Sequence, residues 1–288
     1  RGVGIAAFSF GIGLAGDTAE LSIELDPDDV FTIYAAVADP GEGNDSMLTQ
    51  IAAHRLSVPL EKIKLYTRDT DKTASMGPAA ASRMTFMAGN ALLNAIEKME
   101  QAMREAGART YDGLVKAGKP TYFKGYYKND IPVGLDKQTG HGNSMVSDVH
   151  NIQMAEVEVN TQTGETKVLK MTCAVDAGTI LNPINFEGQV EGGIDMGVGF
   201  ALREEYILGK TKDYVSFKFP TIRDSFDTEI ITRQTPRDNG PLGATGIGEM
   251  TMISTAPAVI NAIYNACGAR IFSLPAKPEK VLAALAGK

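Results

Sequence analysis

The spacing of apolar residues predicts two β-hairpins, one in each half of the chain. Apolar and polar residues alternate in residues 20–25 and 30–37, and again in residues 153–159 and 167–175, with turn-forming residues between the members of each pair. A break that contains aspartate and glycine follows each hairpin, and apolar residues at helical spacing follow each break. The two halves therefore share one order, which is hairpin, loop and helix.

The remaining apolar patterns predict further helices and strands around the hairpins. Apolar residues at helical spacing give the expected helices, at about 47–56, 83–106, 186–205, 255–267 and 278–285. Short apolar runs give the expected single strands, at 2–8, 63–66, 214–219 and 229–233. Because antiparallel hairpins combine with helices in this order, the pattern indicates an α+β fold and not a doubly wound sheet.

The repeated order predicts two related subdomains, each an antiparallel or mixed sheet packed with helices. A short echo supports the repeat, because Ala-Val-Ala-Asp-Pro-Gly at 36–41 resembles Ala-Val-Asp-Ala-Gly at 174–178. The stretch between the two halves is rich in glycine and lysine and has no sustained periodicity. We therefore expect a first subdomain at 1–118, a connecting segment at 119–151 and a second subdomain at 152–288.

Composition excludes several classes of protein. The 288 residues are 43% hydrophobic and 22% charged, as in ordinary globular proteins. A formal net charge of -7 and an isoelectric point near 5.1 offer no basic surface for nucleic acid. No apolar stretch is long enough to span a bilayer, and the first residues do not form a secretory signal, so we expect a cytoplasmic protein without a membrane segment. The chain opens at Arg1 inside an expected strand, which suggests a fragment or a processed subunit.

The residues that most often bind metals are too scattered to predict a metal site. Cys173 and Cys267 are far apart and lie in apolar surroundings, so neither a disulfide framework nor a zinc site is indicated. The histidines, His54, His141 and His150, lack the spacing of a metal-ligand pair. We expect no protein ligand to a metal, and we expect His54 to pack on the apolar face of its helix.

Four glycine-rich stretches are candidates for one shared binding site. They lie at 41–44, 77–82, 188–193 and 240–249, each near a strand end or a helix start. Glycine and other small residues let backbone N–H groups approach and donate to an anionic ligand. None of the four has the spacing of a Walker or Rossmann nucleotide-binding loop. A single Gly-x-Gly often only turns the chain, but four such stretches together favour a site.

Glu249 is the candidate catalytic residue, because it ends the fourth stretch where small residues meet an apolar run. A carboxylate in that place would be partly desolvated, which raises its pKa and makes it a better base near neutral pH. The alternative is a carboxylate that only stabilises the N-terminus of the helix that follows.

In their order and spacing, the four stretches resemble the molybdenum hydroxylases of the xanthine oxidase and aldehyde oxidoreductase family, and most closely their C-terminal molybdopterin-binding region. The resemblance extends over nearly the whole chain. The motifs that carry it are Gly41-Glu42-Gly43, Ala80-Ala81-Ser82, Leu181-Asn182-Pro183, Gly188-Gln189, Gly246-Ile247-Gly248-Glu249 and Leu274-Pro275-Ala276.

The resemblance implies a role for each motif. Glu249 would be the general base beside molybdenum, and Gln189 would hydrogen-bond a ligand or the pterin near the metal. Molybdenum itself would be held through the pterin. The residues expected to bind the cofactor are Gly41, Glu42, Gly43, Asn44, Ala79, Ala80, Ala81, Ser82, Arg83, Asn182, Gln189 and Gly248. Many relatives have Gly-Gln-Gly where this chain has Gly41-Glu42-Gly43, which puts an acceptor in place of an amide donor and leaves contact by Glu42 in question.

By resemblance, the chain is the molybdopterin-binding portion of an oxidoreductase that hydroxylates an aldehyde to a carboxylic acid, or an N-heterocycle, with oxygen from water. Aldehydes are favoured as substrates and a cytosine dinucleotide as the form of the pterin. Iron–sulfur clusters, with FAD as a further option, would lie in other domains or subunits, and the other half of the molybdenum site would be a partner. Two alternatives stay open, a noncatalytic cofactor-holding or assembly subunit and a cofactor-free hydrolase based on Glu249.

Overall fold

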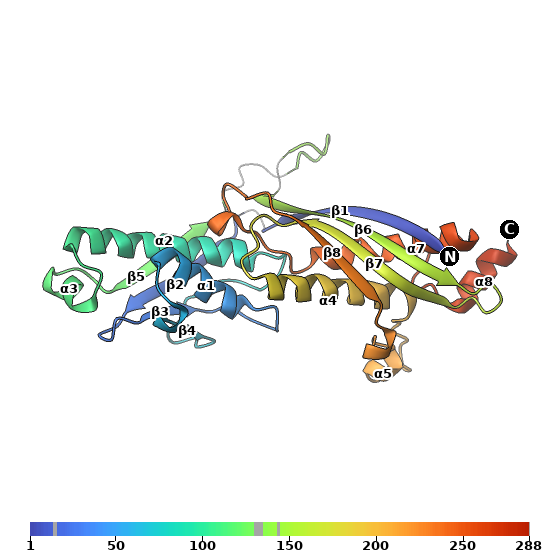
Figure 1. The fold of residues 1–288 in the computed structure, drawn as a ribbon, viewed down its shortest axis with the longest axis horizontal. Coiled ribbons are helices and arrows are strands. Elements are labelled where there is room, and N and C mark those ends of the chain that lie inside the picture. The colour runs from blue at the N-terminus through green and yellow to red at the C-terminus, as the bar shows by residue number, and fades with distance from the viewer. Residues whose placement is uncertain (14–15, 130–134, 143–144, 288) are drawn as a thin grey trace.

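The computed structural model describes residues 1–13, 16–129, 135–142 and 145–287, and it forms an elongated molecule with one four-stranded sheet toward each end (Figure 1). The strands are β1 Gly2–Ile12, β2 Thr18–Leu25, β3 Phe31–Ala35, β4 Ile63–Thr67, β5 Tyr122–Lys128, β6 Ser147–Val159, β7 Thr166–Asp176 and β8 Asp227–Arg233. The helices are α1 Asn44–Leu56, α2 Met84–Ala106, α3 Tyr111–Lys116, α4 Pro183–Leu202, α5 Tyr214–Phe217, α6 Met250–Ile253, α7 Thr255–Cys267 and α8 Pro278–Ala286. Within these ranges, none of the helices has the length and apolar character needed to cross a bilayer.

The first sheet has the order β4-β3-β2-β5, and α2 packs on it. β2 pairs antiparallel with both β3 and β5, whereas β3 pairs parallel with β4. Alternation along β2 turns Leu21, Ile23 and Leu25 into the core, where each is at most 1% exposed. Gly125 of β5 allows close packing, because a Cβ there would lie 2.0 Å from the carbonyl oxygen of Ala91 in α2.

The second sheet has the order β1-β6-β7-β8, and α7 packs on β1 and β6. β1 pairs antiparallel with β6 over its whole length, and β7 pairs parallel with β8. A Cβ on Gly4 would lie 2.1 Å from the backbone nitrogen of Ala262, so glycine in β1 lets α7 lie directly on the strand. Gly193 and Gly197 likewise let α4 pack closely on its neighbours, because added Cβ atoms would collide with Thr251 and Thr255.

The two sheets repeat one arrangement, and the α+β fold of two related subdomains is confirmed. In each, an antiparallel hairpin is followed by a helix and by a strand parallel to the second strand of the hairpin. The echo between 36–41 and 174–178 also has one structure, because a carboxylate oxygen accepts a backbone N–H two residues on in both places. The pairs are Asp39 with Gly41 at 2.9 Å and Asp176 with Gly178 at 3.2 Å.

Each sheet includes one strand that lies outside the expected limits of its subdomain, which were placed at 118 and 152. β1 lies near the start of the chain but completes the second sheet, and β5 lies in the expected connecting segment but completes the first. Residues 130–134 and 143–144 of that segment are outside the described part of the chain. The limits themselves stay a proposal.

Most expected elements are confirmed, and two local expectations are wrong. The expected strand at 214–219 is instead the short helix α5, because Asp213 and Ser216 form a reciprocal capping box. The glycine-rich stretch 188–193 lies inside α4, in agreement with the helix expected at 186–205, and this helix is capped by Asn182 and begins at Pro183. His54 is exposed and does not pack on the apolar face of α1.

Candidate functional site

A cleft of about 620 Å³ lies where the two halves of the molecule meet, and parts of all four glycine-rich stretches line it. Its size is in the range of small-molecule and cofactor sites. Every residue expected from the sequence to act there lines the cleft except Ala81, whose carbonyl oxygen accepts the N–H of Gly13 at 3.5 Å. The third stretch lies inside α4, and of its residues only Gln189 lines the cleft.

Three long helices begin at this cleft. The first residues of α1, α2 and α4 are among the cleft-lining residues, and these helices are 13, 23 and 20 residues long. A helix N-terminus carries roughly half a positive elementary charge and N–H groups without helical partners. Asp39 and Asn182 already accept N–H groups at the starts of α1 and α4, whereas α2 has no side-chain cap, so the start of α2 is the helix end that best suits an anionic or phosphate-bearing ligand.

Asp39 organises the first glycine-rich loop from outside the cleft lining. Its Oδ1 accepts the N–H groups of Gly41 and Gly43 at 2.9 and 3.1 Å, and its Oδ2 accepts the N–H of Asp45 at 3.1 Å. Burial alone would raise the pKa of Asp39, but these N–H groups outweigh it and the pKa is lowered. The N–H groups of Gly41 and Gly43 therefore hold the loop together, contrary to the expectation that they hold a ligand.

The side chain of Glu42 forms a hydrogen bond within its own loop. Its Oε1 accepts a hydrogen bond from Nδ2 of Asn44 at 2.5 Å, and the same amide group donates to the carbonyl oxygen of Ala38 at 2.9 Å. The other oxygen, Oε2, is shielded from solvent and has no hydrogen-bond partner in the described structure. Burial raises the pKa of Glu42, and the nearby charge of Asp39 adds to the rise. Glu42 lines the cleft, and its contact with a cofactor there stays a prediction.

Arg83 shapes the second stretch, and this differs from its expected role as a cofactor ligand. The side chain is 2% exposed and forms an ion pair with Asp17 through Nε at 2.8 Å. Nη1 donates to the carbonyl oxygens of Met76 and Pro78, and Nη2 donates to that of Thr18. Four of the five N–H donors of the guanidinium are thus taken by the chain itself.

Asn182 also has a structural role that the sequence did not suggest. Its Oδ1 accepts the N–H of Asn185 at 3.1 Å and so caps α4. Asn185 in turn lies against Gly43, where an added Cβ would be 2.2 Å from its Nδ2. Gly43 has a φ of 92°, so both its conformation and its neighbour require glycine. This contact joins the first loop to the start of α4.

Two side chains, one from each half of the molecule, hold the peptide group between Gly248 and Glu249. Nε2 of Gln189 donates to the carbonyl oxygen of Gly248 at 2.7 Å. The N–H of Glu249 donates to Oγ of Ser82 at 3.0 Å. Gly246 lets the loop approach, because a Cβ there would lie 1.8 Å from the carbonyl oxygen of Ser82. We name this arrangement, Ser82 and Gln189 on either side of one peptide group, the peptide clamp.

The carboxylate of Glu249 is free to act beyond its own loop. Glu249 immediately precedes the four-residue helix α6, and its side chain makes no capping hydrogen bond. A role confined to capping α6 is therefore not supported. Glu249 is exposed in this chain, so the expected desolvation is not provided by the chain's own residues.

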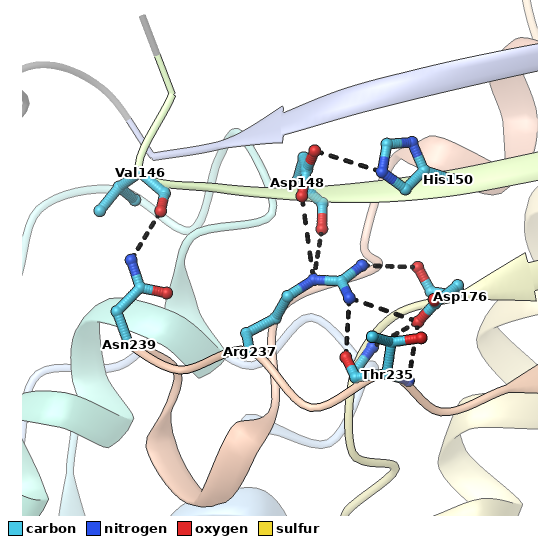
Figure 2. Close-up of polar contacts among 8 residues, drawn as sticks. Val146, Asp148, His150, Asp176, Thr235, Arg237 and Asn239 are labelled. Carbon is cyan, nitrogen blue, oxygen red and sulfur yellow. Dashed lines mark hydrogen bonds and ion pairs between the residues drawn. The ribbon is translucent and has the colours of Figure 1, made fainter. Parts of the chain in front are cut away.

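A network around Arg237 holds the loop that leads to Glu249 (Figure 2). Its guanidinium donates to the carbonyl oxygens of Asp148, Asp176 and Thr235 at 3.0, 3.3 and 2.7 Å. Asn239 adds a hydrogen bond to the carbonyl oxygen of Val146 at 2.7 Å. The loop is thus fastened to the start of β6 and the end of β7. Sequence reasoning missed Arg237, since nothing local shows which carbonyl groups it meets.

The cleft fits a phosphate-bearing organic cofactor better than a metal ion bound by side chains. In the described part of the chain, no three His, Cys, Asp or Glu residues form a group that could hold a metal. Gly41, which lines the cleft, borders open space, because an added Cβ would meet no atom within 4 Å. Helix N-termini, small residues and hydroxyl or amide groups suit an organic anion.

Comparisons with known proteins agree with this site. Residues 1–226 match the family model described as a molybdopterin cofactor-binding domain. The chain is 39% identical over 293 residues to an aldehyde oxidoreductase of Megalodesulfovibrio gigas, an alignment that covers 99% of this chain and 32% of that protein. It is 31% identical over 308 residues to a probable hypoxanthine oxidase of Escherichia coli, with the same two coverages.

A solved structure has the same fold. The aldehyde oxidoreductase from Desulfovibrio gigas matches with a TM-score of 0.94 at 38% identity, and the match covers 99% of this chain and 32% of that one. The chain spans about a third of the length of the relatives it matches. The family model and the relative at 39% identity show that this chain belongs to the molybdopterin-binding region of the molybdenum hydroxylase family.

Proposed function

We propose that the chain is the molybdopterin-binding portion of an oxidoreductase that hydroxylates an aldehyde to a carboxylic acid, with Glu249 as the general base. The observation that carries the proposal is the peptide clamp. Contacts from both halves of the molecule meet at the peptide group of one exposed glutamate, at the edge of a cleft suited to an organic anion.

The residues of the cleft divide the work between binding and proton transfer. When bound, the molybdenum–pterin group would supply the two-electron redox chemistry. The start of α2, which has no side-chain cap, would bind its anionic groups, with Ala79, Ala80 and Asn44 lining the walls. Ser82 and Gln189 would orient Glu249, which in its ionised form would accept a proton at a carboxylate oxygen.

Aldehydes are the favoured substrates because the relative that shares 39% identity is named an aldehyde oxidoreductase, whereas the relative at 31% is named a probable hypoxanthine oxidase. N-heterocycles are the second candidate on the same grounds. We propose a cytosine dinucleotide as the form of the pterin. We place iron–sulfur clusters, and FAD if the enzyme uses it, in parts of the enzyme outside this chain.

The two alternatives receive less support from the cleft. A cofactor-free hydrolase would need a second catalytic group beside Glu249, but the other carboxylate among the described cleft-lining residues, Glu42, is turned into its own loop. A noncatalytic holding subunit would not need Glu249 to be positioned.

Metal analysis of the complete enzyme tests the proposal. We expect molybdenum and an oxidised pterin product in stoichiometric amounts, and oxidation of aldehydes in preference to N-heterocycles across a substrate panel. Active enzyme that contains neither molybdenum nor pterin would overturn the proposal. Preference for heterocycles would overturn only the substrate class.

A further inference from the structure

Two amide side chains are buried between apolar neighbours where β6 meets α6. The inward-facing positions of β6 from 149 to 157 are all at most 1% exposed, and they are Val149, Asn151, Gln153, Ala155 and Val157. The two polar members, Asn151 and Gln153, donate to the carbonyl oxygens of consecutive residues in α6. This short helix begins directly after Glu249. The amides therefore act on the segment that carries the proposed base.

Gln153 is the centre of this buried polar group. Its Nε2 donates to the carbonyl oxygen of Thr251 at 2.5 Å and to Sγ of Cys173 at 3.8 Å. Its Oε1 accepts a hydrogen bond from the hydroxyl of Thr255 at 2.5 Å. An amide is costly to bury unless its donors and its acceptor are bonded, and in Gln153 they are. Such a group specifies one arrangement of its neighbours, because a shift would leave a buried polar atom without a partner.

Asn151 makes the second contact between β6 and α6. Its Nδ2 donates to the carbonyl oxygen of Met250 at 3.2 Å, and its Oδ1 accepts a hydrogen bond from the hydroxyl of Ser254 at 2.9 Å. Because the two amides hold adjacent carbonyl groups, α6 can neither turn nor slide on β6 without breaking one of these bonds. The start of α6, where Glu249 lies, is therefore fixed relative to the second sheet.

The same polar group extends to the helix that carries the peptide clamp. Oγ1 of Thr251 donates to the backbone carbonyl oxygen of Gln189 in α4 at 3.4 Å. Gly193 of α4 leaves room for this threonine, because a Cβ there would lie 2.1 Å from its hydroxyl oxygen. Thr251 thus joins α6, which follows Glu249, to α4, which contains Gln189. An apolar side chain at its place would pack there but would make no directional bond.

We propose that Gln153 is a positioning residue for Glu249 and that it acts through Thr251 on the peptide clamp. Gln153 is not among the described residues that line the cleft, so it acts from the core of the second sheet. By holding Thr251, it keeps α6 and α4 in the one arrangement in which Gln189 meets the peptide group before Glu249. The proposal rests on the proposed function, since it takes Glu249 to be the base.

Steady-state kinetics of Gln153→Leu in the complete enzyme tests the positioning role. The substitution nearly keeps the size of the side chain but removes its bonds to Thr251 and Thr255. We expect kcat to fall about tenfold, with KM and molybdenum content at their wild-type values. Val157→Ala, on the same face of the same strand, is the matched control, and it should lower the thermal midpoint and leave kcat unchanged. Unchanged kcat in Gln153→Leu, or an equal loss in Val157→Ala, overturns the proposal.

Hydrogen exchange of the backbone, read by mass spectrometry, tests the positioning role without turnover. The N–H of Glu249 donates to Oγ of Ser82, so its exchange rate reports on the clamp. We expect the peptide at 246–252 to exchange several-fold faster in Gln153→Leu than in the wild type, and α1 to exchange at the wild-type rate. Thr255→Val removes the hydroxyl that donates to Gln153, and it should give a smaller change of the same kind even if the leucine variant does not fold. Wild-type exchange at 246–252 in every variant that folds overturns the proposal.

Combination with Glu249→Gln separates this proposal from the proposed function. If Gln153 acts through the base, Gln153→Leu should lower kcat no further in the enzyme that already carries Glu249→Gln. A further fall in that enzyme, equal to the fall in the single variant, would show a general structural loss and overturn the positioning role. Wild-type turnover of Glu249→Gln alone would overturn the proposed function, and the positioning role with it. An inactive Glu249→Gln enzyme beside a fully active Gln153→Leu enzyme would overturn only the positioning role.

Discussion

Removing either half of the peptide clamp should weaken catalysis more than stability. Ser82→Ala removes the acceptor of the 3.0 Å hydrogen bond from the N–H of Glu249, and Gln189→Leu removes the donor of the 2.7 Å hydrogen bond to the carbonyl oxygen of Gly248. Gly248 and Glu249 are exposed, so water can satisfy either group. Each variant should therefore lower the free energy of unfolding by only about 0.5–1 kcal/mol, the lower part of the range for one hydrogen bond.

The effect on turnover should be larger, because the clamp fixes the peptide group from which the Glu249 side chain extends. A displacement of about 1 Å in a reacting group can lower the rate about 10²-fold. When only one of the two hydrogen bonds of the clamp is lost, we expect a smaller displacement and a smaller loss of rate. We expect kcat to fall about tenfold in each single variant, which corresponds to about 1.4 kcal/mol in the activation free energy, with KM nearly unchanged.

The assay is steady-state kinetics of the complete enzyme together with its molybdenum and pterin content. The increase in activation free energy of the double variant should exceed the sum of the increases in the two single variants. Each remaining side chain still restrains the peptide group in a single variant, whereas neither does in the double variant. Thr172→Ala is the matched control, since it removes a 3.4 Å hydroxyl hydrogen bond to Glu229 away from the cleft. Unchanged kcat in both single variants, or a loss of activity that only follows loss of cofactor, would refute the role of the clamp.

Three further predictions concern the loops and their supports. Gly246→Ala should lower the thermal midpoint by an amount equivalent to about 1–3 kcal/mol, because its Cβ would lie 1.8 Å from a carbonyl oxygen. Gly188→Ala is the control in the same melting experiment. It should be neutral or stabilising, because its Cβ would meet no atom within 4 Å. The lowered pKa of Asp39 means that its ionised form stabilises the fold above its ordinary value of 3.8, and that this stabilisation is lost as the pH falls through the lowered pKa. Denaturant unfolding should therefore show a steeper loss of stability below about pH 4 for the wild type than for Asp39→Asn, and equal slopes would contradict this. Arg83→Met should cost about 3–5 kcal/mol, because it removes the buried side of the ion pair with Asp17 and the N–H groups that bond to three carbonyl oxygens of the chain. A change below about 1 kcal/mol in denaturant unfolding would show that Arg83 is not the support of its loop.

Most of the fold could be predicted because the patterns that indicate its helices and strands involve residues close together in the sequence. Alternation around a turn, as at 20–37, and helical spacing, as at 84–106, depend on neighbours within a few residues. The prediction failed at 214–219, where a brief alternation was outweighed by the capping pair Asp213 and Ser216. The pairing of β1 with the second sheet could not be predicted, because it joins residues about 150 positions apart.

The site was predictable as a set of loops but not as a set of contacts. Glycine-rich stretches identify where backbone can approach a ligand, and parts of all four do meet at one cleft. The partners of each side chain depend on the tertiary fold. Arg83 and Asn182 carry polar groups that suit a cofactor, yet their groups bond to the chain itself. The Asp-Pro-Gly at Asp39 was a usable signal, since it is typical of a turn in which the carboxylate accepts backbone N–H groups.

The most direct measurement of the central claim is the turnover of Glu249→Gln in the complete enzyme, with molybdenum and pterin content measured on the same sample. Glutamine keeps the size of the side chain and the backbone N–H that donates to Ser82, but it cannot accept a proton at neutral pH. We predict that the cofactor content stays at the wild-type level and that kcat falls by about 10²–10⁴-fold. Turnover close to the wild-type rate with full cofactor content would contradict the assignment of Glu249 as the base.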